Sequence, residues 1–233
     1  MNKNRLIHHT KSLISRNKSS TAGFTILELM IASAVFAVVL LILAIGAISF
    51  TNSYYSGITS SEVQTVARAI MSEVSQSVEF SENVTTLPQS GAVSGYCIDN
   101  TMYSYELGLE VVSSPTTSQD QNYHGLVVDN NSSCSTNPTP SLPQTPNLPS
   151  SQHELLNQHM RLTAFDITQL AGNLYTIHLK VVYADNAILV PPLPGGLGAG
   201  YASQWDSMRC APGVGSQFCA ISDLTTSVEQ RLN

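Results

Sequence analysis

Charged side chains are scarce in this chain. Asp, Glu, Lys and Arg make up 11% of its 233 residues, whereas about a quarter is usual for a soluble protein. After Gly23, five Lys and Arg face sixteen Asp and Glu, a formal side-chain charge of −11. Binding to a phosphate backbone requires clustered basic residues. Nucleic-acid binding by the folded body is therefore disfavoured, although a few exposed side chains could still provide it.

The sequence also lacks a recognisable catalytic motif. The glycine-rich run Gly195–Gly200 has no Lys-Ser/Thr pair and follows prolines, so it indicates a surface loop rather than a phosphate loop. His153 and His159 are six residues apart, which does not place them on one helix face as in a zinc protease. Asp206 and Asp223 could contribute to a calcium site, but their spacing does not favour one over ordinary loop acids. We therefore expect no catalytic residue, no metal site, no cofactor and no enzymatic activity.

Cysteine is present four times, always well beyond the apolar run of the N-terminus, at Cys97, Cys134, Cys210 and Cys219. There is no C-x-x-C motif and no Cys/His cluster, so the spacing does not match a zinc site. An even number of cysteines behind an export signal favours disulfides in an oxidising compartment. Four cysteines allow three connectivities, and the residues alone leave all three open.

A basic segment and a long apolar run stand out at the N-terminus. The run from Leu29 to Phe50 is interrupted only by small residues and is long enough to cross a bilayer as a helix, which takes about 20 residues. Residues 1–23 contain no acid and half of all the basic residues, namely Lys3, Arg5, Lys11, Arg16 and Lys18. This flank predicts a cytoplasmic N-terminus, with the remainder of the chain on the other side of the membrane. The small residues Thr21-Ala22-Gly23 precede the apolar run, whereas the cleavage site of an ordinary secretory signal follows it.

Glu28 is the unexpected residue at the head of this run. An acid deep in a bilayer costs about 2.5–3.5 kcal/mol on insertion scales, so its presence is by default a functional hypothesis. The alternative is that Glu28 lies at the membrane interface, with its carboxylate reaching water. The basic leader, the Gly23–Phe24 junction and the immediate apolar run together favour the functional reading.

The segment Gly23-Phe24-Thr25-Ile26-Leu27-Glu28-Leu29-Met30-Ile31-Ala32 resembles the N-terminal segment of type IV prepilins and pseudopilins. The resemblance covers about 30 residues and implies that a prepilin peptidase cleaves between Gly23 and Phe24 on the cytoplasmic side. It also implies N-methylation of Phe24 and pairing of Glu28 with the N-terminal ammonium of a neighbouring subunit. The expected partners are thus the peptidase, the membrane and other pilin subunits, which the N-terminal helix would contact. A surface ligand of the head stays unknown.

The resemblance also implies a disulfide. Pilins often close a C-terminal loop with one, which would join Cys210 to Cys219 around residues 210–219, and Cys97 and Cys134 would form the other pair.

Periodicity extends the helix beyond the membrane. Tyr54 and Tyr55 fit an interfacial aromatic belt, and Gly57 could kink the helix. Apolar residues then recur at helical spacing to about Glu79, at Ile58, Val63, Val66, Ile70, Val74 and Val78.

The rest of the chain predicts strands and loops. Alternating residues predict an antiparallel hairpin of Met160–Gln169 and Leu174–Tyr183. Further strands are expected at Tyr103–Val112, His124–Asp129 and Cys219–Val228. An extended exposed loop is expected over the proline-rich 137–149, and a second loop over Val190–Gly200.

Together these patterns predict an α+β fold in which a long helix packs on an antiparallel sheet. We expect a cleaved leader (1–23), a membrane and filament-core helix (24–50), its amphipathic continuation (51–80) and a globular head (81–233).

The leading hypothesis is a structural subunit, and a minor one, of a type IV pilus or pilus-like filament. It would be made as a single-pass membrane precursor and end in an extracellular or periplasmic filament. Two alternatives stay open, a pseudopilin of a type II secretion system and a membrane-anchored adhesin that never polymerises.

Overall fold

The computed structural model describes residues 23–115, 121–132, 134, 138–190 and 205–231. The expected leader and most of the loop Val190–Gly200, with its glycine-rich run, lie outside these residues. The chain divides into two compact units, Met1–Ala47 and Ile48–Asn233. Each unit is described by itself below.

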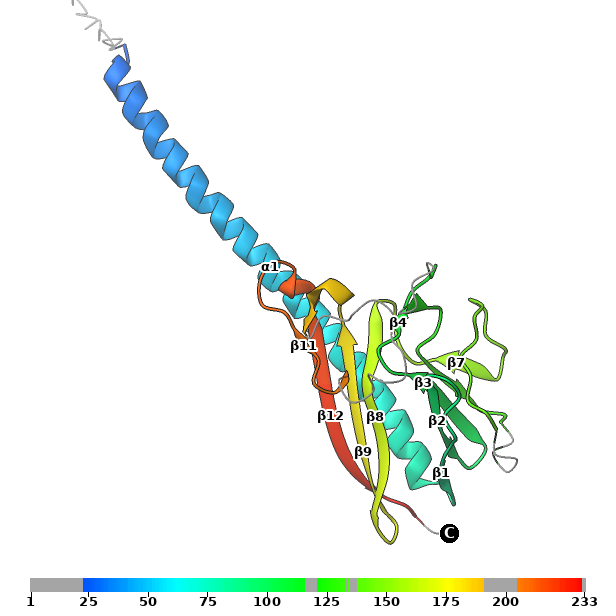
Figure 1. Ribbon diagram of the computed structural model, residues 1–233. Helices are drawn as coiled ribbons and strands as arrows, with labels where there is room; N and C mark the ends of the chain where they lie inside the picture. Colours follow the sequence, from blue (N-terminus) through cyan, green and yellow to red (C-terminus); the bar gives the residue numbers. More distant parts are fainter. Residues whose placement is uncertain (1–22, 116–120, 133, 135–137, 191–204, 232–233) are drawn as a thin grey trace, which may run out of the picture. The chain divides into compact units, whose positions relative to one another are not determined.

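One helix, α1 (Ile26–Glu79), accounts for all the regular structure described in the first unit and continues into the second. It passes through Gly57 without interruption. Figure 1 labels this helix. Its residues in the first unit are exposed, and apart from Glu28, Ser33 and Gly46 they are apolar. The helix ends at Glu79, as its apolar periodicity predicts.

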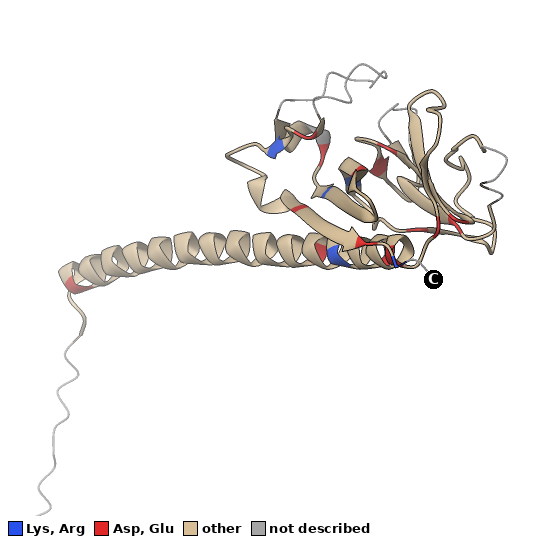
Figure 2. Ribbon diagram, turned by 90° about the horizontal axis from the view of Figure 1, so that it is seen from below, with Lys and Arg blue, Asp and Glu red and all other residues tan. Residues whose placement is uncertain are grey.

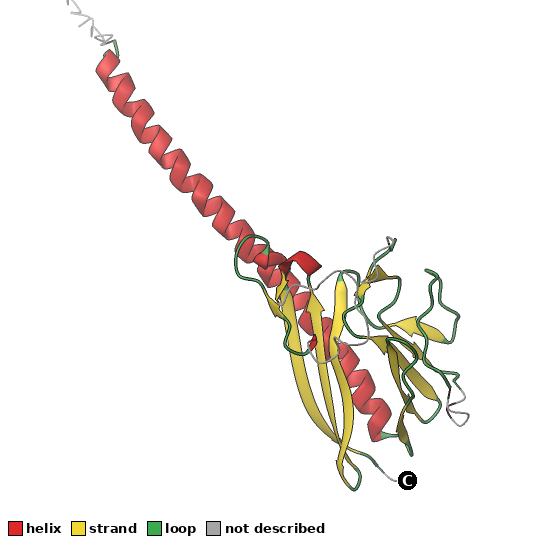
Figure 3. Cartoon of the chain, viewed as in Figure 1, coloured by secondary structure: helices red, strands yellow, loops and turns green. Residues whose placement is uncertain are grey.

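The second unit combines the C-terminal part of α1 with antiparallel sheets, which confirms the predicted α+β class (Figure 3). A five-stranded sheet has the order β1-β2-β3-β6-β7, and a three-stranded sheet has the order β12-β9-β8. The strands of the first are β1 (Val84–Thr86), β2 (Val93–Ile98), β3 (Thr101–Glu106), β6 (Leu126–Asp129) and β7 (Gln152–Glu154). The strands of the second are β8 (Met160–Ala171), β9 (Leu174–Tyr183) and β12 (Ala220–Glu229).

Two small ribbons complete the second unit. The parallel pair is β4 (Glu110–Val111) with β5 (Gln121–Asn122), and the antiparallel pair is β10 (Leu189–Val190) with β11 (Arg209–Cys210). Two short 3₁₀ helices lie at η2 (Asn186–Ile188) and η4 (Ser216–Phe218).

The predicted hairpin and the predicted last strand are confirmed. Strands β8 and β9 pair from Met160↔Tyr183 to Ala171↔Leu174, and β12 pairs along the other side of β9. Gly172, in the turn, has φ 56°, a conformation that glycine adopts without steric cost.

One apolar cluster holds the helix and both large sheets together. Buried residues of α1 pack with aromatic residues of the five-stranded sheet and with aliphatic residues of β8 and β9. The helix contributes Val63, Ala67, Ile70, Met71, Val74 and Val78. Burial on this scale is the main stabilising contribution in such a domain.

Three predictions are wrong in detail. The strand expected over Tyr103–Val112 ends at Glu106, because Gly108 turns the backbone at φ 80°, and β4 then pairs in parallel with β5. The proline-rich loop is not exposed throughout, since Leu142 packs against Leu109 and Val127. Ile58 is 46% exposed, and its neighbour Thr59, one helical turn before Val63, is buried instead.

Candidate functional site

The amino end of α1 is closed by a reciprocal pair of hydrogen bonds. The backbone N–H of Glu28 donates to Thr25 Oγ1 at 3.2 Å, and the backbone N–H of Thr25 donates to Glu28 Oε2 at 3.4 Å. This arrangement is a capping box, in which two otherwise unpaired N–H groups at the start of a helix find acceptors. The carboxylate also faces the positive end of the helix dipole. Glu28 therefore has a partner within its own chain, and the Thr-x-x-Glu spacing of Thr25 and Glu28 is the sequence signal of this pair.

The surroundings of Glu28 are apolar and open. Phe24 is 83% exposed and Ile26 is 81% exposed, and every residue from Gly23 to Ile58 is exposed. Glu28 is the only charged residue of α1 in this stretch (Figure 2). A helix that is apolar on all sides requires a bilayer or neighbouring apolar helices around it, and α1 is long and apolar enough to cross a membrane.

The predicted junction lies just before this helix. Gly23 and Phe24 precede the first helical residue and are both exposed. The family described as Prokaryotic N-terminal methylation motif matches residues 18–49, which span the junction, the capping box and most of the apolar run. The chain carries the N-terminal methylation motif that is the signature of type IV prepilins.

No curated protein and no solved structure matches the chain. The motif implies processing by a prepilin peptidase and assembly with other pilin subunits. Together with the apolar helix, it fits a membrane-anchored precursor. The individual roles of Gly23, Phe24 and Glu28 stay predictions.

The structure joins the cysteines of the second unit, the head, in two pairs. Cys97 on β2 is bonded to Cys134, 37 residues later, and Cys210 on β11 is bonded to Cys219 across the loop that contains η4. These are the pairs that the resemblance to pilins implied. Both bonds cross-link segments of the second unit, and a cross-link between distant residues stabilises a fold mainly by restricting the unfolded chain.

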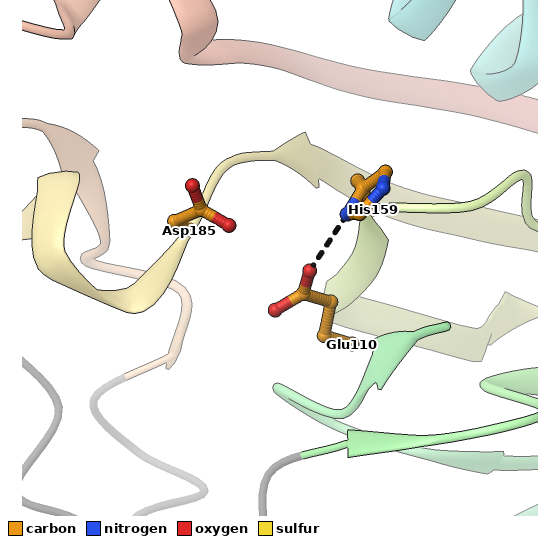
Figure 4. Close-up of side chains that lie close together, drawn as sticks. All are labelled: Glu110, His159 and Asp185. Atoms are coloured by element: carbon orange, nitrogen blue, oxygen red, sulfur yellow. Dashed lines mark hydrogen bonds and ion pairs between the residues drawn. The ribbon is translucent and has the colours of Figure 1, made fainter. Parts of the chain in front are cut away.

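Two clusters of histidine and acidic side chains lie on the head. One consists of Glu110, His159 and Asp185 (Figure 4), and the other of His178, Asp206 and Asp223. In each cluster, potential ligand atoms lie within 4.8 Å of one another. Asp206 and Asp223, which the sequence analysis considered together as possible calcium ligands, do lie together, and the structure adds His178 to them. Local spacing suggested neither His178 nor the first cluster, because strand pairing brings these residues together.

The two histidines singled out from the sequence are both on the surface, as predicted. The His153 side chain is 45% exposed and lies 3.3 Å from a Glu73 carboxylate oxygen. The His159 side chain is 52% exposed and lies 3.1 Å from the buried carboxylate of Glu110. They therefore occupy different environments although they share a segment.

Proposed function

We propose that the mature chain begins at N-methylated Phe24 and is a structural, low-copy subunit of a type IV pilus or pilus-like filament. The observation that carries the proposal is Glu28, a single carboxylate at the head of an exposed apolar helix within a methylation motif. A helix that served only as a membrane anchor would not require this charge.

The partner of Glu28 would change on assembly. In the isolated chain its carboxylate accepts a hydrogen bond from the Thr25 backbone N–H at 3.4 Å, which is a long and therefore weak bond. Cleavage before Phe24 creates an ammonium group, and in an apolar core an ammonium and a carboxylate are each unfavourable alone but favourable in contact. Exchange of the weak cap for an intersubunit ion pair would fix the axial register of neighbouring helices more than it would add stability.

The test is incorporation of Glu28→Ala and Glu28→Gln into filaments. Both variants should insert into the membrane and be processed, since the apolar run is unchanged. Their amount in sheared filaments should fall by about tenfold or more, which corresponds to about 1.4 kcal/mol. Glu62→Ala is the matched control, because Glu62 is another exposed acid of the same helix. Normal levels of both Glu28 variants in sheared filaments would contradict the pairing role.

The low copy number is supported by the size of the head, which is larger than a simple major pilin needs, and by its long loops. Quantitative mass spectrometry of sheared filaments should find this chain well below the most abundant subunit. Equal abundance would exclude a minor role. Presence in membranes but never in filaments would favour an anchored adhesin.

A further inference from the structure

The cluster of Glu110, His159 and Asp185 is built at the open end of the β8–β9 hairpin. Met160 at the start of β8 pairs with Tyr183 at the end of β9. His159 immediately precedes that pair and Asp185 follows it by two residues, so both flank the same end of the ribbon (Figure 4). Glu110, the first residue of β4, approaches from a third segment.

Glu110 is fixed before any ligand arrives. Its side chain is 3% exposed, and its Oε2 accepts a hydrogen bond from Arg161 Nη2 at 2.8 Å. Arg161 is fully buried and also donates to the carbonyl oxygens of Gly108 and Ala184, so its guanidinium group is held as well. The second carboxylate oxygen, Oε1, is left facing Nδ1 of His159 at 3.1 Å.

The other two side chains are accessible from solvent. The backbone of His159 has φ 63°, and its N–H donates to the Val111 carbonyl oxygen at 2.8 Å, which anchors the residue beside β4. Within the described part of the chain, the Asp185 carboxylate has no hydrogen bond or ion pair. A cavity of about 140 Å³ is lined by His159, Tyr183, Asp185 and Phe218, which gives room for an ion and its remaining water ligands.

We propose that Glu110, His159 and Asp185 bind one divalent transition-metal ion of the Zn²⁺ type, with a fourth position open to water or to a donor from another molecule. An imidazole with two carboxylates suits such an ion, whereas Ca²⁺ and Mg²⁺ prefer oxygen ligands alone. Ligands at about 2.0–2.1 Å from a tetrahedral ion lie roughly 3.3 Å apart, close to the 3.1 Å between His159 Nδ1 and Glu110 Oε1. The ion would take the place of the hydrogen bond between these two atoms.

Charge favours a cation in this cluster. The positive charge of Arg161 cancels the negative charge of Glu110. Arg161 is bound to Oε2 of Glu110, so Oε1 stays available to a metal ion. Asp185 then adds an uncompensated negative charge. The second cluster differs, since Lys180 Nζ lies 3.6 Å from Asp206 Oδ1 and 3.9 Å from Asp223 Oδ2. An ammonium group already lies beside both carboxylates there, and we assign no metal to that cluster.

The experiment is calorimetric titration of Zn²⁺ into the untagged, chelator-treated mature chain in detergent, with Co²⁺ absorption as a second readout. One ion per chain is expected to bind, and Co²⁺ should show the intense visible bands of tetrahedral coordination. His159→Gln and Asp185→Asn should each weaken binding by at least about tenfold. Both side chains are exposed, so the metal-free variants should unfold at the temperature of the native chain.

Two matched controls locate the site. His153→Gln removes another exposed histidine paired with a glutamate, and His178→Gln removes the histidine of the second cluster. Both should leave Zn²⁺ binding unchanged. Absence of Zn²⁺ binding, retention of full affinity by His159→Gln, loss of binding in His178→Gln, or displacement of Zn²⁺ by equimolar Ca²⁺ would each overturn the proposal. Since the measurement needs no filament, its failure would leave the proposed function intact.

Discussion

At the scale of single residues, the least expected feature of the head is the buried pair of Arg161 and Glu110. The two residues are 51 positions apart, and both are almost inaccessible to solvent. No local pattern could have predicted the contact, because Arg161 stands within an alternating strand sequence where an exposed position for arginine is the usual expectation. Their pairing depends on how β4 lies against β8, which is a property of the assembled fold.

Replacing Arg161 with Met should destabilise the head by about 3–5 kcal/mol, because it leaves the Glu110 carboxylate buried without its cation. The double variant Arg161→Met/Glu110→Leu should recover much of that loss, since replacing both partners by apolar side chains removes the unpaired charge. The free energy of unfolding of both variants can be measured by urea unfolding, followed by the fluorescence of Trp205, which is buried and is the chain's single tryptophan. If Arg161→Met were as stable as the native chain, the ion pair of Arg161 and Glu110 would not stabilise the head.

His124 makes the stability of the head depend on pH. Its Nε2–H donates to the Thr145 carbonyl oxygen at 2.9 Å, and its Nδ1 lies 3.5 Å from Glu154 Oε2. The Glu154 carboxylate raises the pKa of His124, and burial opposes that effect without cancelling it. Glu154 in turn accepts backbone N–H groups of Gly125 and Leu126.

A raised pKa in the folded state means that protonation of His124 favours folding. The contribution is complete below the unfolded pKa of about 6.5 and is lost as the pH rises through the higher folded value. Unfolding midpoints measured between about pH 6 and pH 8 should therefore fall with pH, and the fall should be smaller in His124→Gln. His153→Gln serves as the control. An identical pH profile for native and His124→Gln chains would contradict this assignment.

At the scale of elements, the spacing of apolar residues predicted the long helix and the long strands but not the short strands. The end of α1 and the strands β8, β9 and β12 follow from apolar spacing, because each element has ten or more residues over which a period can be recognised. The short strands β4 and β5 could not be predicted in this way, since two residues carry no period. Leu142 likewise lies in a proline-rich segment whose composition suggests exposure, and only the packing against Leu109 reveals its role.

The C-terminal end of α1 is capped by residues that follow β12. Gln230 Nε2 donates to the Ser81 carbonyl oxygen at 2.7 Å, and the Arg231 backbone N–H donates to the Glu79 carbonyl oxygen at 2.8 Å. Arg231 Nη2 also lies 2.6 Å from a Glu79 carboxylate oxygen. The last carbonyl groups of a helix otherwise lack partners within the helix, so the end of the chain secures the end of the helix.

Gln230→Ala should cost about 1–3 kcal/mol, because Gln230 is buried and its loss leaves a buried carbonyl without a donor. Arg231→Ala should cost less, within about 1 kcal/mol, since the Arg231 side chain is 70% exposed and its ion pair is screened by water. Urea unfolding of both variants gives the comparison. A larger effect from Arg231→Ala would show that the surface ion pair, rather than the buried amide, fastens the helix end.

At the scale of the whole molecule, the chain combines two kinds of surface. The apolar helix of the first unit is exposed on every side and contains one charge, that of Glu28. The second unit has its own apolar core and two disulfides, and acids outnumber bases on it (Figure 2). The first surface requires lipid or other helices, and the second is suited to water outside the reducing cytoplasm. Under the proposed function, processing by a prepilin peptidase would link the two, because it would turn a membrane precursor into a subunit that can assemble.

Mass spectrometry of the N-terminus, in cells with and without the prepilin peptidase, tests this account most directly. With the peptidase, the chain should begin at Phe24 and carry one methyl group on its amino nitrogen. Without it, residues 1–23 should remain attached and unmethylated. An intact leader on the chain from peptidase-positive cells would contradict the account.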